Sequence, residues 1–238
     1  MAQYGESDEV RRIQAVYAER ERRSAIRGAV DRASHGNAYL VREYRDRLVG
    51  LLRERLERSL RECRILDIGC GHGSLLGWFH EQGVPARNLF GVDLLANRIA
   101  VARAKYPSFN LQEGNAEQLC FPEEFFDLVA VFTVFSSVLN RQMADNLARS
   151  ICRILSSGGA VVWYDVRYPN PCNPHLRGMT KRRIREIFPR FTLELEPISL
   201  CPPLTRRLGP FIDVAYPVLT AASGLRTHYL GLLRPPRH

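Results

Sequence analysis

Long apolar runs and closely paired cysteines are absent from this 238-residue sequence. No stretch is long and apolar enough for a membrane-spanning helix. The first eight residues lack a basic start followed by an apolar stretch, so they do not resemble a secretory signal. The six cysteines form no C-x-x-C pair, which argues against a zinc site or a disulfide framework, and we expect no bound metal. These absences predict a cytoplasmic protein without a membrane span.

Lysine is also scarce, since Lys105 and Lys181 are the only two among 34 basic residues. The chain nevertheless carries a formal net charge of +9 and a sequence pI of about 9.6, values that would suit a nucleic-acid partner. Many arginines alternate with acids, as in 53–58, and this pattern is typical of solvated helix faces. The strongest basic cluster spans 181–185. Nucleic acid is therefore a possible but less favoured partner.

A short apolar run followed by alternate glycines is the most informative segment of the chain. Residues 65–68 lead into Gly69, Gly71 and Gly73. Glycines allow the backbone to turn sharply and to approach a ligand that a Cβ would exclude. Asp67, near the end of the run, can accept hydrogen bonds from a cationic group. The segment predicts a binding loop for a nucleoside with a positively charged tail, and S-adenosylmethionine (SAM) fits that description.

Two other nucleotide-binding loops do not fit the spacing. The dinucleotide fingerprint G-x-G-x-x-G would need a third glycine at position 74, where this chain has Ser74. A Walker-type loop needs Gly-Lys followed by Ser or Thr, and no such sequence follows. Residues 88–93 form a second apolar run that ends in Asp93, and an acid at this point of a βαβ fold binds ribose hydroxyls. Two alternatives stay open. The glycine segment could form a turn that binds no ligand, and Asp93 could be a solvated acid at the end of a strand.

The glycine loop resembles the first motif of class I SAM-dependent methyltransferases, D/E-x-G-x-G-x-G, matched by Asp67, Gly69, Gly71 and Gly73. Strand–helix units at the family's spacing extend the resemblance from residue 65 to about 165. It implies an α/β fold with a Rossmann-like, seven-stranded, mostly parallel sheet, an antiparallel last strand and helices on both faces. We expect one structural domain, with an N-terminal helical cap over 1–62 and a core over 63–238 that carries lid helices at about 202–224.

Hydrophobic periodicity gives the expected elements. Helices are predicted at 7–23, 39–60, 96–105, 141–154 and 181–187, and strands at 65–68, 88–93, 109–113, 125–135, 160–165, 191–198 and 226–233. Residues 34–37 are expected to form a loop of the cap, and 155–159 a turn before the fifth strand.

The resemblance also implies which residues hold the cofactor. The family usually has Asp after its third strand to contact the adenine amino group, whereas this chain has Asn115, whose amide can still bond the adenine edge. Tyr17 in the cap could close over the cofactor, although packing explains it equally well. The expected cofactor-binding residues are Asp67, Gly69, Cys70, Gly71, Gly73, Asp93, Leu94, Arg98, Asn115, Ala116, Phe132, Thr133 and Tyr17.

The segment after the fourth predicted strand bears on the acceptor. Family members that methylate exocyclic base nitrogens or glutamine amides carry Asp/Asn-Pro-Pro-Tyr/Phe there, and this chain has Thr133-Val134-Phe135-Ser136. A hydroxyl acceptor would benefit from a general base. His175, on a proline-rich loop at the carboxyl edge of the sheet, is the first candidate, and His35 is the second. Asp165, at the end of the fifth strand, could orient an imidazole or bind the acceptor.

We therefore predict a SAM-dependent methyltransferase that acts on a hydroxyl or amine of a small molecule, such as a sugar, lipid or secondary-metabolite intermediate, and releases S-adenosylhomocysteine (SAH). The protein is expected to be a monomer or a homodimer. Two alternatives stay open: an RNA or protein methyltransferase that uses the arginine-rich surface, and a non-catalytic SAM-binding module.

Overall fold

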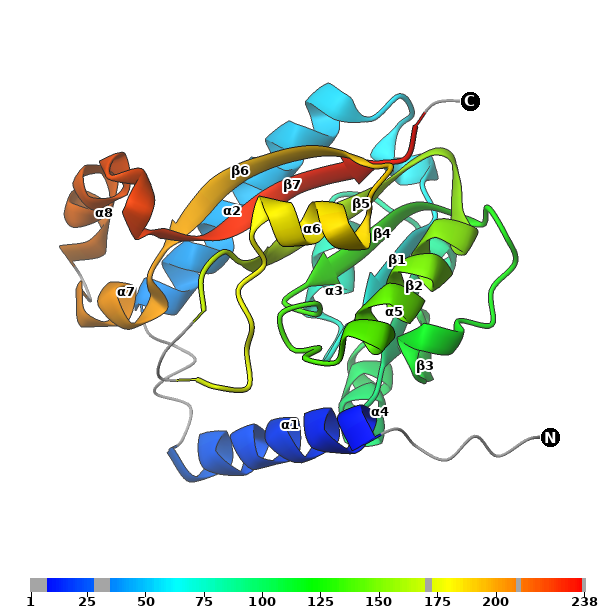
Figure 1. The fold of residues 1–238 in the computed structure, drawn as a ribbon, viewed down its shortest axis with the longest axis horizontal. Coiled ribbons are helices and arrows are strands. Elements are labelled where there is room, and N and C mark those ends of the chain that lie inside the picture. Colours follow the sequence, from blue (N-terminus) through cyan, green and yellow to red (C-terminus); the bar gives the residue numbers. More distant parts are fainter. Residues whose placement is uncertain (1–7, 28–34, 170–172, 209–210, 237–238) are drawn as a thin grey trace.

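The computed structural model describes residues 8–27, 35–169, 173–208 and 211–236. Its strands are β1 (Ile65–Ile68), β2 (Leu89–Asp93), β3 (Asn110–Glu113), β4 (Phe126–Phe132), β5 (Leu155–Val166), β6 (Thr192–Leu200) and β7 (Arg226–Arg234). They form one seven-stranded sheet in the order β3-β2-β1-β4-β5-β7-β6 (Figure 1). Neighbours from β3 to β5 are parallel, and β7 is antiparallel to both β5 and β6. The predicted fold class is confirmed.

Helices cover both faces of this sheet. The α-helices are α1 (Asp8–Arg27), α2 (His35–Arg55), α3 (Ser74–Glu81), α4 (Ala96–Lys105), α5 (Arg141–Ile154), α6 (Lys181–Ile187), α7 (Pro202–Leu208) and α8 (Ile212–Ala221). Short 3-10 turns include η4 (Ala116–Gln118) and η6 (Ser223–Leu225). Figure 1 shows α5 and α6 in front of the sheet and α2 and α3 behind it.

The core consists of two apolar layers, one on each face of the sheet. Met143, Leu147 and Ile151 of α5 pack against β4 and β5 on one face. Leu48 and Leu52 of α2 pack with residues of α3 and α4 on the other. The central strands are buried along nearly their whole length, as parallel strands covered on both faces must be. Their carboxyl ends therefore meet at a single edge that the helices leave accessible.

Two expected segments differ from the structure. α2 begins at His35, so residues 35–37 are helical and the expected loop there is wrong. Gly36 is buried in this first turn, a tertiary contact that local sequence does not reveal. The expected turn at 155–159 occurs as an irregularity inside β5: Leu155 lies opposite Phe126, whereas Ala160 lies opposite Leu128. The intervening residues bulge, with Gly158 at φ +78°.

Two helical segments stand apart from the layers of the sheet. α1 lies across the end of the molecule next to α4, and α7 and α8 lie at another end (Figure 1). α7 and α8 join β6 to β7 and pack with α2 in a small third apolar cluster. The division into a cap over 1–62 and a core over 63–238 stays a prediction. Within the described residues, no helix is long and apolar enough to cross a membrane.

Candidate functional site

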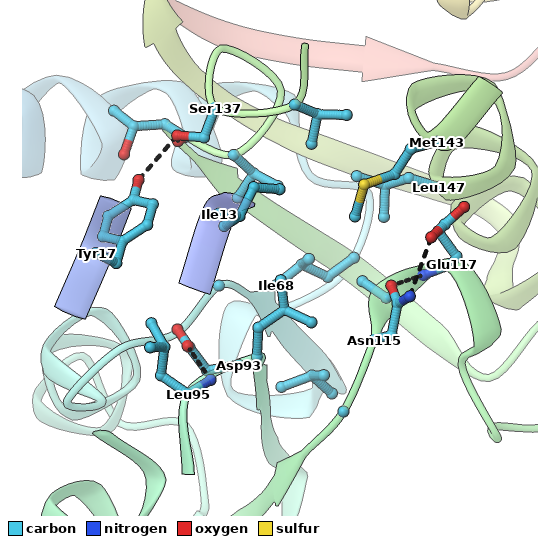
Figure 2. A pocket seen from close by; sticks show the side chains of 18 of the residues that line it. Ile13, Tyr17, Ile68, Asp93, Leu95, Asn115, Glu117, Ser137, Met143 and Leu147 are labelled. Carbon is cyan, nitrogen blue, oxygen red and sulfur yellow. Dashed lines mark hydrogen bonds between the residues drawn. The ribbon is translucent and has the colours of Figure 1, made fainter. Parts of the chain in front are cut away.

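A pocket with about 770 Å³ of empty space, partly open to solvent, lies at the carboxyl edge of the sheet. Ile68 and Gly69 at the end of β1 and Val92 near the end of β2 line it, and Figure 2 labels Ile68. The remaining lining residues are Ile13, Tyr17, Asp93, Leu94, Leu95, Arg98, Gly114, Asn115, Ala116, Glu117, Phe132, Thr133, Val134, Ser137, Val138, Met143 and Leu147. Nine of the thirteen expected cofactor residues are among them: Tyr17, Gly69, Asp93, Leu94, Arg98, Asn115, Ala116, Phe132 and Thr133.

The glycine loop connects β1 to β2 through backbone hydrogen bonds. The N–H groups of Gly69 and Cys70 donate to the carbonyl oxygen of Val92 at 2.7 and 3.1 Å. Gly71 N–H donates to the Asp93 carboxylate at 2.8 Å. Gly69, Gly71 and Gly73 all have positive φ, which L side chains rarely adopt. A Cβ at Gly71 would meet no atom within 4 Å, so the loop leaves open space there, as a cofactor cradle requires.

The two acids of the loop occupy different environments. Asp93 is buried, lines the pocket and also accepts the N–H of Leu95 at 3.0 Å. Asp67 is buried within β1 and is not among the lining residues. Burial raises the pKa of Asp67 well above its usual range, and the charge of Asp93 raises it further. Cys70, Gly71 and Gly73 likewise lie outside the lining, so their expected contacts with the cofactor, like those of Asp67, stay predictions.

A hydrogen-bonded trio fixes the wall after β3. Asn115 Oδ1 accepts the N–H of Glu117 at 3.0 Å and caps η4. Asn115 Nδ2 donates to the Glu117 carboxylate at 3.0 Å (Figure 2), and Asn146 Nδ2 donates to the other oxygen of that carboxylate at 2.8 Å. An Asp at 115 would place two carboxylates against each other. Glu117 therefore explains why this chain carries Asn where the family usually has Asp.

Helix α1 covers the pocket from the side opposite the sheet. Tyr17 OH donates to Ser137 Oγ at 2.8 Å, since that hydroxyl itself donates to the Thr133 carbonyl at 3.1 Å. The Arg98 guanidinium lies 4.7 Å from the centre of the Tyr17 ring and pairs with Glu21. These contacts tie α1 both to the loop after β4 and to α4. The expected closure of Tyr17 over a cofactor is compatible with this position and stays a prediction.

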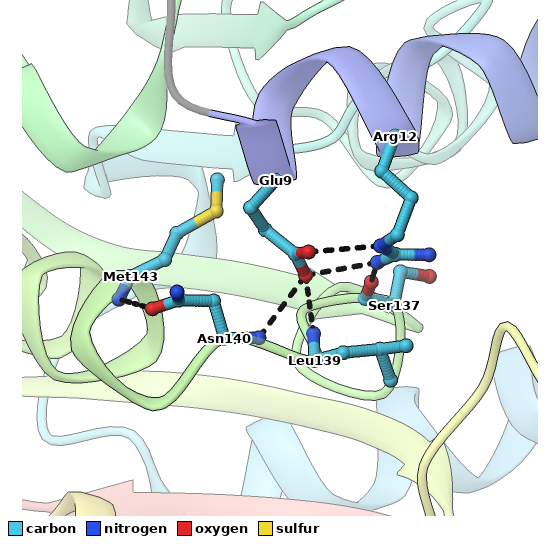
Figure 3. A network of polar contacts seen from close by, with 6 residues as sticks. All are labelled: Glu9, Arg12, Ser137, Leu139, Asn140 and Met143. Carbon is cyan, nitrogen blue, oxygen red and sulfur yellow. Dashed lines mark hydrogen bonds and ion pairs between the residues drawn. The ribbon is translucent and has the colours of Figure 1, made fainter.

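The amino end of α1 is held by a charged contact, which Figure 3 shows. Glu9 Oε1 accepts the N–H groups of Leu139 and Asn140 at 2.5 and 3.1 Å. Arg12 bonds Glu9 at 2.8 Å and the Ser137 carbonyl at 2.6 Å. The hydrogen bond from Arg12, helped by the two N–H groups, lowers the pKa of Glu9 to about 2 despite partial burial. We call Glu9, Arg12 and their partners at 137–140 the α1 clamp.

Thr133, the residue after β4, has a strained backbone conformation. Its φ of +57° is a rare value for a β-branched residue, and such strain concentrates at functional sites. Its N–H donates to the Tyr164 carbonyl at 2.7 Å and its hydroxyl to the Phe132 carbonyl at 2.7 Å. These bonds hold Thr133 against the pocket while the chain turns toward Ser137.

The three expected catalytic residues do not line the pocket. His175 is exposed, and its backbone N–H donates to Asn173 Oδ1 at 3.2 Å. His35 is exposed at the start of α2. Asp165 is buried, and its oxygens accept the N–H groups of Ser136 and Val166 at 2.9 and 2.8 Å. Burial raises the pKa of Asp165 to about 6, against those hydrogen bonds. Their catalytic roles stay predictions.

Some lining residues carry no local sequence signal for a site. Ile13, Val138, Met143 and Leu147 are apolar positions that periodicity assigns simply to packing. Glu117 could have been found as a polar neighbour of Asn115, two residues away. Only the tertiary arrangement brings the apolar side chains to the same cavity as Asp93 (Figure 2).

A second polar group lies behind the pocket wall. Phe132, which lines the pocket, stacks on Tyr164 with ring centres 5.3 Å apart, and His228 stacks on Tyr164 at 4.9 Å. Tyr164 OH donates to Ser199 Oγ at 3.1 Å, and that hydroxyl donates to Glu43 at 3.2 Å. Burial lowers the pKa of His228 to about 4, so the ring is neutral at pH 7.

Comparisons with known proteins agree with the fold and the loop. Residues 65–159 match the family model described as a methyltransferase domain. Demethylmenaquinone methyltransferase of Chlorobaculum parvum is 28% identical over 130 residues, which are 55% of this chain and 51% of that protein. Fatty-acid O-methyltransferase of Mycolicibacterium smegmatis is 33% identical over 106 residues, which are 44% of this chain and 37% of that protein. The matches thus span about half or less of these relatives.

Solved structures share the fold at low sequence identity. A SAM-dependent methyltransferase from Mesorhizobium loti has a TM-score of 0.59 at 22% identity, covering 77% of this chain and 95% of the other. Geranyl diphosphate C-methyltransferase from Streptomyces coelicolor, solved with Mg²⁺, geranyl diphosphate and SAH, has a TM-score of 0.59 at 16% identity, covering 81% and 77%. The sheet order and the solved structures show the class I SAM-dependent methyltransferase fold, and residues 65–159, which contain the glycine loop, are similar to the methyltransferase domain of that family.

Proposed function

We propose that this protein transfers the methyl group of SAM to a hydroxyl or amine of a small, largely apolar molecule. The observation that carries the proposal is the pocket at the carboxyl edge of the sheet. There Asp93, Asn115 and Gly69 share one cavity with an apolar wall, and α1 covers it. We also propose that the protein is cytoplasmic and is either a monomer or a homodimer.

The polar lining suits the nucleoside part of SAM. Asp93 is the proposed acceptor for the ribose hydroxyls, since its carboxylate faces the pocket while backbone N–H groups hold it in place. Asn115 and Ala116 are proposed to bind the adenine edge, with Leu94 against the ring. The open space at Gly71 would admit the amino-acid tail. SAM supplies an already activated methyl group, so the chain mainly has to position the acceptor and exclude water.

Three features favour an acceptor near the end of β4. Phe132 and Thr133 line the pocket there, and the loop over 134–138 continues the wall under α1. Val134 and Val138 make this wall apolar, which favours an acceptor with apolar surface. His175 stays the proposed general base for a hydroxyl acceptor, with His35 as the second candidate and Asp165 as a positioning group.

The relatives support a small-molecule acceptor. The relative at 28% identity is named for demethylmenaquinone, and the relative at 33% identity is named for fatty acids. Because they are covered only in part, their acceptors guide the choice of assay and do not assign a substrate. The RNA or protein methyltransferase and the non-catalytic module remain the competing functions.

Transfer assays with methyl-labelled SAM test the proposal. The acceptor panel holds a demethylated quinol, a long-chain fatty acid, a phenol, an aromatic amine and bulk tRNA. We expect label in at least one small molecule and none in tRNA, and we expect His175→Ala to slow transfer to a hydroxyl more than transfer to an amine. Label in tRNA alone would favour the RNA alternative. SAH binding without transfer to any of them would favour the non-catalytic module.

A further inference from the structure

Helix α8 presents an apolar face to solvent. Phe211, Val214 and Val218 are 75%, 78% and 73% exposed. The spacing of these three residues puts them on one side of the helix. Large apolar side chains exposed to this degree and grouped together mark interaction sites more often than isolated ones do. The face is therefore a candidate docking surface.

The opposite side of α8 is firmly anchored. Ile212 and Tyr216 are buried in the small apolar cluster that α8 forms with α2. The Tyr216 ring lies 4.4 Å from that of Tyr39, and its hydroxyl accepts the N–H of Leu200 at 3.1 Å. The exposed apolar residues are thus not a displaced part of the core, because the helix already buries its other face.

The exposed surface continues beyond α8. Leu225 in η6 and Tyr168 are also exposed, and Arg167 donates to the Ser223 carbonyl at 3.1 Å, which ties the segment around Tyr168 to η6. Among the described residues, seven large apolar side chains are exposed, and five of them belong to this region. We call these five the α8 patch: Tyr168, Phe211, Val214, Val218 and Leu225.

The charges around the α8 patch indicate which kind of partner could bind to it. Arg226 donates to the Thr220 carbonyl of α8 at 2.9 Å, and Asp213, the one acid of α8, pairs with Arg42 at 3.2 Å. Residues 173–185 contain five basic residues and no acid. Lys181 from this segment lies 5.6 Å from the Tyr229 ring, and Arg167 lies 4.8 Å from the same ring. The apolar surface is therefore bordered by positive charge.

A second copy of this chain would bring the same positive charges together, which disfavours self-association through the α8 patch. An anionic lipid surface complements both components, since acyl chains accept the apolar side chains and phosphates accept the arginines. We propose that the α8 patch docks the protein reversibly on anionic membranes, with α8 lying in the headgroup region and Tyr168 at the interface. This inference goes beyond the proposed methyl transfer and does not depend on it.

Co-sedimentation with lipid vesicles tests the proposal. We expect the wild-type chain to bind vesicles that contain phosphatidylserine at near-physiological salt and to bind pure phosphatidylcholine vesicles far less. The double variant Val214→Asp/Val218→Asp should bind roughly tenfold less, because it removes apolar surface and adds negative charge. The matched control is Val101→Asp, at a 52% exposed position on α4, which should bind like the wild type.

Thermal unfolding and SAH binding of each variant check that it is folded, and both replaced valines point away from the core. Wild-type protein that stays in the supernatant with anionic vesicles would overturn the proposal. Equal binding of the double variant and the wild type would also overturn it. So would concentration-dependent self-association that the double variant abolishes, because the patch would then be an interface between copies.

Discussion

Single residues at the pocket edge combine structural and functional demands. Asp93 holds two backbone N–H groups and still faces the cavity, and Asn115 avoids a clash of charges with Glu117. Both arrangements keep a polar group at a fixed place in a mostly apolar wall. The strained backbone of Thr133 and the burial of His228 each lead to a prediction about the stability of the folded protein.

Replacing Thr133 with glycine should relieve strain. A non-glycine residue in the left-handed region costs about 1–3 kcal/mol, against which glycine loses about 0.5–1 kcal/mol through chain entropy. We expect Thr133→Gly to leave the free energy of unfolding equal to or above that of the wild type. Val134→Gly, at a neighbouring position without positive φ, should lower it by about 1–2 kcal/mol. Urea unfolding measures both, and a larger loss for Thr133→Gly would contradict the account.

Replacing His228 with phenylalanine should change how stability depends on pH. The pKa of His228 falls from 6.5 to about 4 because the ring is buried. Between these values the unfolded chain binds more protons than the folded one, so this group makes stability rise with pH. The shift corresponds to about 3 kcal/mol. Phenylalanine keeps the stacking on Tyr164 but cannot titrate.

Stability of the wild type and of His228→Phe, measured by urea unfolding from pH 4 to 7, checks this. The difference between them should change across the window in favour of the wild type as pH rises. Asp165 has its pKa raised to about 6 and opposes this slope, but it contributes equally to both proteins. A difference that is constant with pH would show that His228 is not buried as a neutral ring.

Helix α1 is the element on which closure of the pocket depends. The α1 clamp fixes one end, and Tyr17 and Arg98 fix its middle. Since the α1 clamp also bonds the segment before α5, it couples the cover of the pocket to its wall. The sequence pattern predicts the helix but not these contacts.

Glu9→Gln should loosen this cover. A hydrogen bond to a charged group contributes about 1.5–3 kcal/mol, so the neutral amide should weaken the bonds to Arg12, Leu139 and Asn140. We expect faster proteolysis within α1 and weaker SAH binding at pH 7. The low pKa of Glu9 means that the wild type keeps the clamp above about pH 4.5 and loses it as pH falls toward 2.

Glu19→Gln is the matched control on the same helix. Glu19 pairs with Arg22 and Arg23 on the outer side of α1 and makes none of the clamp contacts. Its replacement should leave proteolysis and SAH binding unchanged. Equal effects of the two substitutions would mean that the helix as a whole, and not the α1 clamp, sets closure.

Some parts of the site and the fold can be predicted from the sequence, and others cannot. The glycine loop and Asp93 are signalled locally, because chain turns and strand ends need particular residue types. Met143 and Leu147 look like any buried face of a helix, and only packing turns them toward the cavity. The start of α2 at His35 and the bulge before Ala160 depend on tertiary contacts and register, which periodicity does not encode.

On the scale of the whole molecule, positive charge is spread along the chain, and part of it is paired with acids. Arg141 bonds Asp145, and Arg182 bonds Glu186. Such pairing reduces the charge available to phosphates. We expect RNA to bind only at low salt and to dissociate by about 150 mM salt, as in non-specific association. Filter binding over a salt series measures this, and tight binding at about 150 mM with a slope of several counterions would favour the RNA alternative.

The central claim is that the pocket binds the SAM nucleoside through Asp93. Isothermal titration of the wild-type protein with SAH tests it most directly, with Asp93→Ala as the variant and Asp145→Ala, a partly exposed acid on α5 outside the pocket lining, as the control. The account predicts one SAH site per chain, about tenfold or more weaker in Asp93→Ala and unchanged in Asp145→Ala. Wild-type protein that binds no SAH, or Asp93→Ala that binds it as tightly as the wild type, would contradict the account.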